Sequence, residues 1–217
     1  MRKWIAPLIV VAAVLITGSV FSRLPATIPT HWNFAGEVDG YSSREWGAWA
    51  LPVLLVFLWG MLKWIPAIDP RGDNYARFTG AFEGIIVLVM LFVFGSQMVI
   101  LASSLGQPVS VDRLAPIGIG LLLMGVGNLL PRAKPNWFVG IRTPWTLSSD
   151  RVWERTHRVG GYFLVAGGAL IVIAGIAVPG LAFGTMITVC AVSAVFLLLY
   201  SYIAWRQERS NSGAVTP

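Results

Sequence analysis

Charged side chains are scarce in this sequence. Asp, Glu, Lys and Arg make up 12% of its 217 residues, whereas an ordinary soluble domain carries about 25%. Hydrophobic residues make up 56%, and the mean hydropathy is strongly positive. This deficit of charge excludes an ordinary soluble domain and indicates an integral membrane protein.

The sequence has only one cysteine, and it has no internal repeat that would indicate two matching halves. The single cysteine, Cys190, excludes an internal disulfide, and we interpret it as a small core residue of the last apolar segment. No internal repeat is evident, and Gln97 is the only amide in the middle of a span. Because transporters are often built from matching halves with interrupted helices, the sequence offers no support for a transporter.

Long uncharged runs are what the chain has instead. A helix needs about 20 mainly apolar residues to cross the hydrocarbon core. The last run is 47 residues long, too many for one span, and Pro179-Gly180 divides it. The uncharged runs are 4–22, 46–62, 84–111, 114–131 and 159–205. We therefore predict an all-α integral membrane bundle of six transmembrane helices.

The first run resembles a signal peptide in one respect, since Arg2 and Lys3 precede it. No clear small-x-small cleavage site follows before Arg23 and Pro25. We therefore interpret it as an uncleaved first span.

Basic residues predict the orientation of this bundle. With six spans and both termini on one side, thirteen of the sixteen Lys and Arg residues fall on that side and three on the other. The positive-inside rule then places both termini in the cytoplasm and residues 22–45 outside. The net charge of +6 is explained by anionic lipid at the inner face, so the bilayer is the expected partner and no direct nucleic-acid partner is needed.

Tryptophans agree with these spans, since amphipathic rings settle at headgroup depth. Those near predicted span ends are Trp4, Trp46, Trp49, Trp64, Trp137, Trp145, Trp153 and Trp205.

Small residues repeat every seven positions in the fifth predicted helix, and Gly180 and Gly184 form a GxxxG at the start of the sixth. Such residues let helix backbones approach closely in lipid. We interpret them as packing inside one bundle rather than as a dimer face. The repeat consists of Gly160, Gly167 and Ala174 alongside Gly161, Gly168 and Gly175.

The outer loop at 22–45 carries the chemistry of an ordered structure. Two prolines hold its start extended, and Gly36 and Gly40 are free to take the positive φ of turns. His31, Glu37 and Asp39 lie within nine residues, but zinc sites have three or four well-spaced ligands and nothing here supplies the rest. We predict a compact loop that binds no metal.

The connection at 132–158 concentrates prolines, aromatics and arginines. Its prolines exclude a long regular helix in its first part. Ser148 or Ser149 is a suitable N-cap, with Asp150 in a first turn favoured by the helix dipole. An amphipathic helix is then expected to run into the fifth span, where Trp153 and His157, four apart, are neighbours and Glu154 can pair with Arg158.

Several polar residues are expected at the same inner depth as this connection: Lys63, Glu83, Asn128, Arg142 and His157. Ionisable groups at membrane depth are usually functional or paired. We interpret Lys63 as snorkelling to headgroup water. For Glu83 two interpretations stay open, a buried pair with Arg142 or His157, or contact with headgroup water.

A catalytic function is poorly supported. A nucleophile activated by His157 would need a specific partner and a residue to orient the imidazole, and the sequence shows neither. We predict neither enzymatic activity nor a cofactor.

Two motifs resemble known proteins. The stretch "PNWFVGIRTPWTLSSDRVWERTHRVGG", with the upstream "GNLLP", is similar to the signature of the SdpI family of bacterial multi-pass membrane proteins. The stretch "IPTHWNFAGEVDGYSSR" resembles a short domain of unknown function that commonly precedes it. The resemblance implies an outer signature of His31, Asn33, Gly36, Asp39 and Gly40. It implies an inner signature of Asn136, Gly140, Arg142, Thr143, Pro144, Trp145, Trp153, His157 and Arg158.

The resemblance implies a module division of 1–113, with three spans, and 114–206, an SdpI-like module of three spans; we expect 207–217 to be a disordered tail. The best-known relative protects its producer from a secreted antimicrobial peptide toxin and holds a cytosolic repressor at the membrane. By this resemblance the chain is a toxin-immunity protein of the bacterial inner membrane, with a peptide toxin outside and a repressor inside as partners. A small transporter or flippase of unknown substrate, and a membrane enzyme acting at the inner cluster, are the competing hypotheses, and the oligomeric state stays open.

Overall fold

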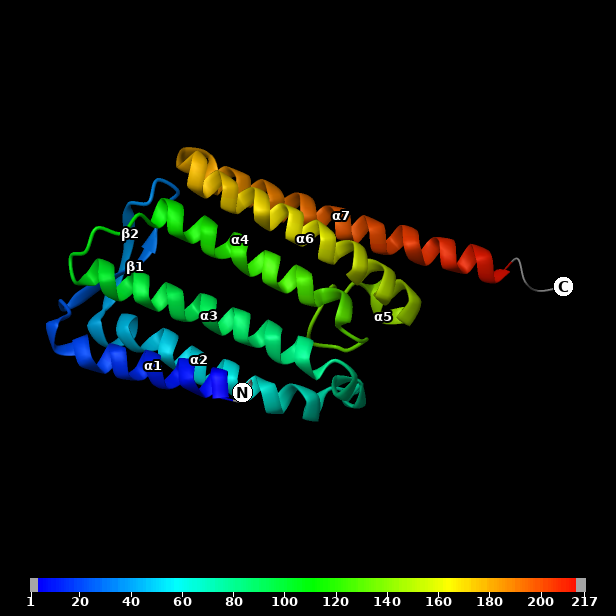
Figure 1. Ribbon diagram of the computed structural model, residues 1–217, viewed down its shortest axis with the longest axis horizontal. Coiled ribbons are helices and arrows are strands. Elements are labelled where there is room, and N and C mark those ends of the chain that lie inside the picture. Colours follow the sequence, from blue (N-terminus) through cyan, green and yellow to red (C-terminus); the bar gives the residue numbers. More distant parts are fainter. Residues whose placement is uncertain (1–3, 214–217) are drawn as a thin grey trace.

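The computed structural model describes residues 4–213, which form an elongated helical bundle (Figure 1). Six helices are long and apolar enough to cross a membrane. They are α1 (Ile5–Val20), α2 (Arg44–Ile68), α3 (Thr79–Ser104), α4 (Val111–Leu129), α6 (Asp150–Ala177) and α7 (Pro179–Gly213). The predicted six-span, helical class is confirmed. Short elements join them: η2 (Phe21–Arg23), η3 (Gly72–Arg77), η4 (Leu130–Arg132) and α5 (Pro144–Ser148).

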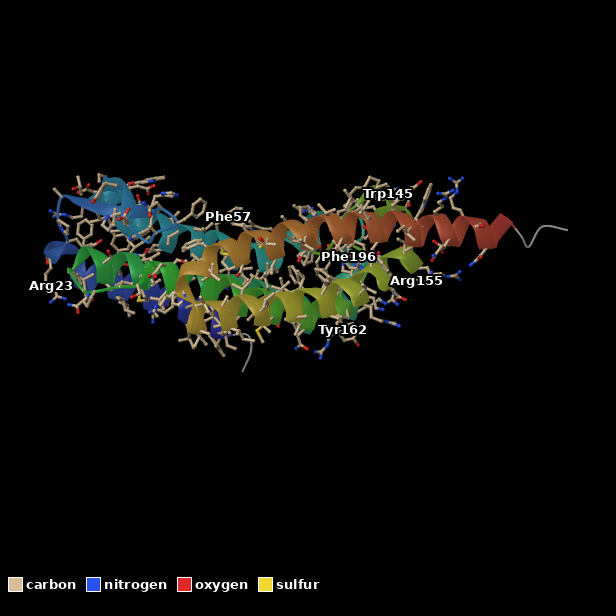
Figure 2. The ribbon with its side chains drawn as sticks, turned by 90° about the horizontal axis from the view of Figure 1, so that it is seen from above. Arg23, Phe57, Trp145, Arg155, Tyr162 and Phe196 are labelled. Atoms are coloured by element: carbon tan, nitrogen blue, oxygen red, sulfur yellow. The ribbon has the colours of Figure 1, made fainter. Side chains whose placement is uncertain are left out.

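The long helices alternate in direction, so each connection lies at one of two ends of the bundle (Figure 1). The hairpin end carries residues 21–43, 105–110 and the α6–α7 junction. The loop end carries residues 69–78 and 130–149. Arg23 lies at the hairpin end and Arg155 at the loop end (Figure 2), in agreement with the segregation of basic residues that predicts the topology.

The helices pack in two groups that meet along α3 and α4 (Figure 1). In the first group, α1, α2 and α3 share an apolar core that includes Ala13, Leu55 and Met90, all fully buried. In the second, α4 packs chiefly against α6, and α6 against α7. Gln97 lies in the first group, where its amide donates to the Thr17 hydroxyl at 3.2 Å and the Ala48 carbonyl at 2.9 Å.

Glycines explain the close approach of α4 and α6. A Cβ added at Gly161 would lie 2.7 Å from the Gly127 carbonyl oxygen, and one at Gly168 would lie 2.5 Å from that of Gly120. A Cβ at Gly160 would instead meet Ile141 of the 132–149 connection and Leu197 of α7, and one at Gly167 would meet Val189 of α7. The small residues therefore form two stripes on α6. Packing inside one bundle is confirmed for both. The same interpretation is wrong for the GxxxG of α7, because Cβ atoms at Gly180 and Gly184 would meet nothing within 4 Å.

The predicted disordered tail is wrong for residues 207–213, because α7 continues to Gly213. Its 35 residues rise about 1.5 Å each, more than the roughly 30 Å hydrocarbon core requires. Glu208 on this extension accepts a hydrogen bond from the Ser149 hydroxyl and pairs with Arg151 at 3.7 Å, which ties the extension to α6. Residues 214–217 lie outside the described part of the chain.

Two further predictions, on Cys190 and Trp153, are wrong. Cys190 is exposed rather than part of a core, because α7 lies at the edge of the bundle and buries only part of its circumference. Trp153 is fully buried rather than at headgroup depth, because the 132–149 connection folds over it. Trp4, Trp46 and Trp64 are exposed near helix ends, as interfacial rings should be.

The outer loop forms a β-hairpin, which the helical interpretation did not anticipate. Strands β1 (Thr27–Trp32) and β2 (Val38–Ser43) pair antiparallel. The fully buried Ile28 of the hairpin packs in one apolar cluster with Ala48 of α2 and with Ile100 and Leu101 of α3. The compact, ordered loop that the sequence predicts is confirmed, and it covers one end of the first helix group.

Candidate functional site

The 132–149 connection is held in one shape by the side chain of Asn136, which is fully buried. Its Oδ1 accepts hydrogen bonds from the backbone N–H groups of Phe138 and Val139, at 2.9 and 2.7 Å. Its Nδ2 donates to the carbonyl oxygens of Lys134 and Val139, at 2.9 and 2.8 Å. One amide therefore satisfies a turn that has no regular secondary structure to do so.

Asp69 joins this connection to the first helix group. It lies just after α2, and its carboxylate accepts from Trp137 N–H at 2.9 Å and from Arg71 N–H at 2.7 Å. The Tyr75 hydroxyl lies 2.8 Å from Asp69 Oδ2 and 3.2 Å from Asn136 Oδ1, so its single proton bridges the two side chains. Burial, together with the hydrogen bond to Asp69 and its negative charge, raises the pKa of the Tyr75 phenol, which keeps the donor protonated.

Trp153 and His157 form the floor beneath the connection. Their rings stack with centroids 4.0 Å apart and planes at 18°, and both residues are fully buried. Trp153 Nε1 donates to the Ala133 carbonyl at 2.8 Å. The prediction that Trp153 and His157 are neighbours is confirmed. Their stacked rings form a flat aromatic surface on which the connection lies.

Both ring nitrogens of His157 are engaged by backbone groups. Nδ1 lies 2.9 Å from the Trp153 carbonyl, and Nε2 lies 3.0 Å from the N–H of Ile141. A carbonyl can only accept and an N–H can only donate, so the imidazole is neutral with its proton on Nδ1. No lone pair is left for proton abstraction, which argues against His157 as a catalytic base.

Gly140 lets the connection lie directly on this ring. Its φ is +125°, and an added Cβ would collide with His157 Nε2 and lie 3.1 Å from the Trp153 ring. Glycine is therefore required here for both conformation and space.

Thr143 ends the connection and begins α5 with a capping box shared with Thr146. The Thr146 hydroxyl donates to the Ile141 carbonyl at 2.7 Å, and the Thr143 hydroxyl donates to Ser201 of α7 at 3.0 Å. The connection is thus attached to α2, α6 and α7 at once.

Several inner-signature side chains remain on the surface. Arg142 is exposed, and its Nη1 donates to the Trp137 carbonyl at 2.7 Å. Trp137 and Phe138 are exposed beside it, while Pro144 and Arg158 are also exposed. Trp145 packs on Tyr202 of α7 with ring centroids 5.1 Å apart, at the same end of the bundle as Arg155 (Figure 2). The loop end therefore combines a rigid backbone with an exposed surface of aromatic and basic side chains.

The hairpin positions its own signature residues. Asn33 Oδ1 accepts from the N–H groups of Ala35 and Glu37 at 2.9 and 3.0 Å, and Gly36 takes a φ of +79°. His31 Nδ1 lies 2.5 Å from Asp39 Oδ1, and both side chains are exposed. Within residues 4–213, no three His, Cys, Asp or Glu side chains gather as a metal site would need.

Gly40 has a different role from the one expected, because its φ is not positive. It lies opposite His31 in the strand pairing, where a Cβ would be 2.8 Å from that of His31. Cross-strand space, rather than turn conformation, requires glycine there.

The comparisons with known proteins cover these same regions. Residues 132–201 match the model of the SdpI/YfhL protein family, and residues 8–56 match a domain of unknown function, DUF1648. The chain carries an SdpI/YfhL segment. Immunity protein SdpI of Bacillus subtilis (strain 168) is 27% identical over 174 residues, which cover 80% of this chain and 81% of that protein. No solved structure matches the chain significantly.

The SdpI/YfhL segment contains Asn136, Gly140, Trp153 and His157, but the structure shows that it does not form the site alone. Asp69 and Tyr75 contribute from outside it, and sequence reasoning missed both. The Asp69-Pro70 pair in the connection after the second predicted span was the one available signal, since a proline suggests that a helix ends before it. Thr146 and Ser201 lie inside the segment and were also missed, because nothing local distinguishes a buried hydroxyl from an exposed one.

Of the two interpretations left open for Glu83, the buried pair with Arg142 or His157 is wrong. Within the described residues Glu83 pairs with neither Arg142 nor His157, because the ring nitrogens of His157 are already engaged and Arg142 faces the surface. Glu83 instead lines a separate crevice with Lys63 and Asn128. The expected Glu154–Arg158 pair is also replaced, since Glu154 pairs with Lys134 at 3.1 Å across the connection.

Proposed function

We propose that this chain is a membrane immunity protein that protects a bacterial cell from a secreted antimicrobial peptide toxin. The observation that carries the proposal is the similarity to Immunity protein SdpI, which extends over 80% of the chain. The DUF1648 match ends within α2 and covers the whole hairpin, and the SdpI/YfhL match covers the 132–149 connection. The two matches thus include the hairpin and the 132–149 connection together with the helices next to them.

The inner bacterial membrane, with the loop end in the cytoplasm, is the proposed location. The segregation of basic residues supports it, because cytoplasmic loops carry an excess of Lys and Arg. In this orientation the hairpin faces the secreted toxin and the loop end faces the cytosol.

The loop end is the proposed attachment surface for a cytosolic repressor. Exposed Trp137 and Phe138 offer apolar contact area, and the Arg142 guanidinium keeps donors free beyond its bond to the Trp137 carbonyl. Aromatic residues and arginine are enriched where proteins bind one another. Because Asn136 and Asp69 fix the backbone, such a partner would bind a surface that needs little ordering.

Deletion of the gene, followed by challenge with membrane-active peptides, tests the proposal. The deleted strain should lose survival, and a plasmid copy of the wild-type chain should restore it. An Asn136→Ala copy, adjusted to equal abundance in the membrane, should restore it less. Equal survival of deleted and complemented strains under every peptide would contradict immunity. Ligand-dependent flux through purified protein in proteoliposomes would favour the transporter hypothesis instead.

A further inference from the structure

A crevice of about 630 Å³ lies between the two helix groups near the loop end. Helices α1, α2, α3 and α4 all line it, and its walls are mostly apolar, with Trp59, Val87 and Leu88 among them. Its polar lining comes from Lys63 on α2, Glu83 on α3 and Asn128 on α4. Three helices therefore bring one cation, one anion and one amide to a single cavity.

These three residues lie at one level of the bundle. Lys63 is five residues from the end of α2, Glu83 is four from the start of α3, and Asn128 is next to the last residue of α4. At about 1.5 Å per residue, each lies within about 8 Å of a helix end. This is the depth at which apolar lipid chains give way to polar headgroups.

Neither charge has a partner among the described residues. Within residues 4–213, Lys63 and Glu83 form no ion pair with each other or with another side chain, and Asn128 makes no side-chain hydrogen bond. Glu83 is half-buried, whereas Lys63 and Asn128 are exposed. Ionisable groups at this depth are costly unless they are paired or hydrated, so the crevice favours an occupant that carries both charges.

We propose that the crevice binds a phospholipid whose headgroup carries a primary ammonium, as in phosphatidylethanolamine. Its phosphate accepts from the Lys63 ammonium and the Asn128 amide, and its ammonium donates to the Glu83 carboxylate. Such charge-assisted hydrogen bonds are roughly twice as strong as neutral ones. The acyl chains lie along the apolar wall. A lipid with a net negative headgroup satisfies Lys63 but is repelled by Glu83.

The test measures lipid retention by the full-length protein, using native mass spectrometry from detergent. The probes are phosphatidylethanolamine, phosphatidylcholine and phosphatidylglycerol with identical acyl chains. Phosphatidylcholine keeps the charges but has no N–H donor for Glu83. We expect the wild type to retain phosphatidylethanolamine above both others. We expect Glu83→Gln to reduce that retention by about tenfold, the effect of losing one charge-assisted hydrogen bond. Lys63→Met should lower the retention of all three lipids.

The control variants are Lys134→Met and Glu154→Gln, which remove the same charges from an ion pair outside the crevice. They should leave lipid retention unchanged. An unchanged preference in Glu83→Gln, an unchanged retention of all three lipids in Lys63→Met, or a wild-type preference for phosphatidylglycerol would overturn the proposal. Glycerophosphoethanolamine, the same headgroup without chains, distinguishes a lipid from a soluble ligand. It should not displace the lipid at matched concentration, and displacement at that concentration would also overturn the proposal.

Discussion

The backbone N–H of Ile141 donates a hydrogen bond to Nε2 of His157 over 3.0 Å, and this bond attaches the 132–149 connection to helix α6. The acceptor ring is fully buried and stacked on Trp153. The buried imidazole therefore holds the connection in position, and its two backbone partners fix the tautomer of the ring. The stability of the loop end should depend on this contact more than on any of its exposed charges.

Replacing His157 by Ala should destabilise the protein measurably. The partly buried Ile141 N–H would lose its acceptor, which costs up to about 1–3 kcal/mol, and the missing ring would leave a void against Trp153. Thermal unfolding in detergent should show a lower midpoint. The neighbouring Thr156→Val is the control, because the buried Thr156 hydroxyl has no hydrogen-bond partner among the described residues. An unfolding midpoint for His157→Ala equal to that of Thr156→Val would contradict the role given to the ring.

Gly140→Ala and Gly106→Ala separate conformation from space. Both glycines have positive φ, +125° and +76°, but only a Cβ at Gly140 would collide with other atoms. The left-handed conformation alone costs about 1–2 kcal/mol for a residue with a side chain. Gly140→Ala should therefore lower the unfolding midpoint clearly more than Gly106→Ala does. Similar midpoints in the two variants would show that the connection can move off the His157 ring.

Arg142→Lys tests whether the loop end binds a partner through paired hydrogen bonds. The guanidinium is presented next to a rigid backbone and can grip a carboxylate or phosphate with two parallel bonds, which lysine cannot reproduce. We expect the variant to lose protection under peptide challenge at unchanged abundance in the membrane. If this face only attracts anionic lipid, Arg142→Lys will protect fully, whereas Arg151→Gln combined with Arg155→Gln will weaken protection.

In the hairpin, Gly40→Val should be more harmful than Ser42→Val. A side chain at Gly40 would be forced against His31 of the opposite strand, and overpacking of this kind costs about 1–3 kcal/mol. Abundance in the membrane and survival under peptide challenge measure the effect. Equal tolerance of both substitutions would mean that function does not depend on the folded hairpin covering the end of the first helix group.

Single-cysteine labelling tests the orientation. Ser42→Cys and Ser148→Cys, each in a Cys190→Ala background, place one thiol at the hairpin end and one at the loop end. An impermeant thiol reagent should label position 42 in intact cells and position 148 only after the membrane is permeabilised. The reverse pattern would invert the topology that the basic residues predict.

Local sequence was sufficient for the features that depend on neighbouring residues. Uncharged runs locate the spans because a helix satisfies its own backbone and needs only apolar length to cross lipid. Ser149 is the N-cap of α6, and its hydroxyl accepts from Val152 N–H at 3.2 Å. Trp153 and His157 were predictable neighbours because residues four apart share a helix face.

Residues far apart in sequence were not predictable in the same way. Tyr75 meets Asn136, 61 positions later, and Asp69 meets Trp137, 68 positions later. One of the two interpretations of Glu83 placed it beside Arg142 or His157, because all three were expected at the same membrane depth. The depth of a residue in the membrane does not specify which side of its helix the residue lies on. In the packed bundle Glu83 lies in a different crevice, between the two helix groups.

The sequence by itself determined that the chain forms six helices long and apolar enough to cross a membrane, although several helix ends differ from the ends of the uncharged runs. It also predicted that the outer loop is ordered. These properties follow from hydrophobicity, charge and backbone preference, which act over one helix or one turn. Only the tertiary structure decided that two glycine stripes on α6 serve two different neighbours, that Trp153 is buried rather than interfacial, and that Lys63 and Glu83 share a cavity without pairing. These properties depend on how helices rotate against one another, and that rotation is set by close contact between backbones that are distant in the chain.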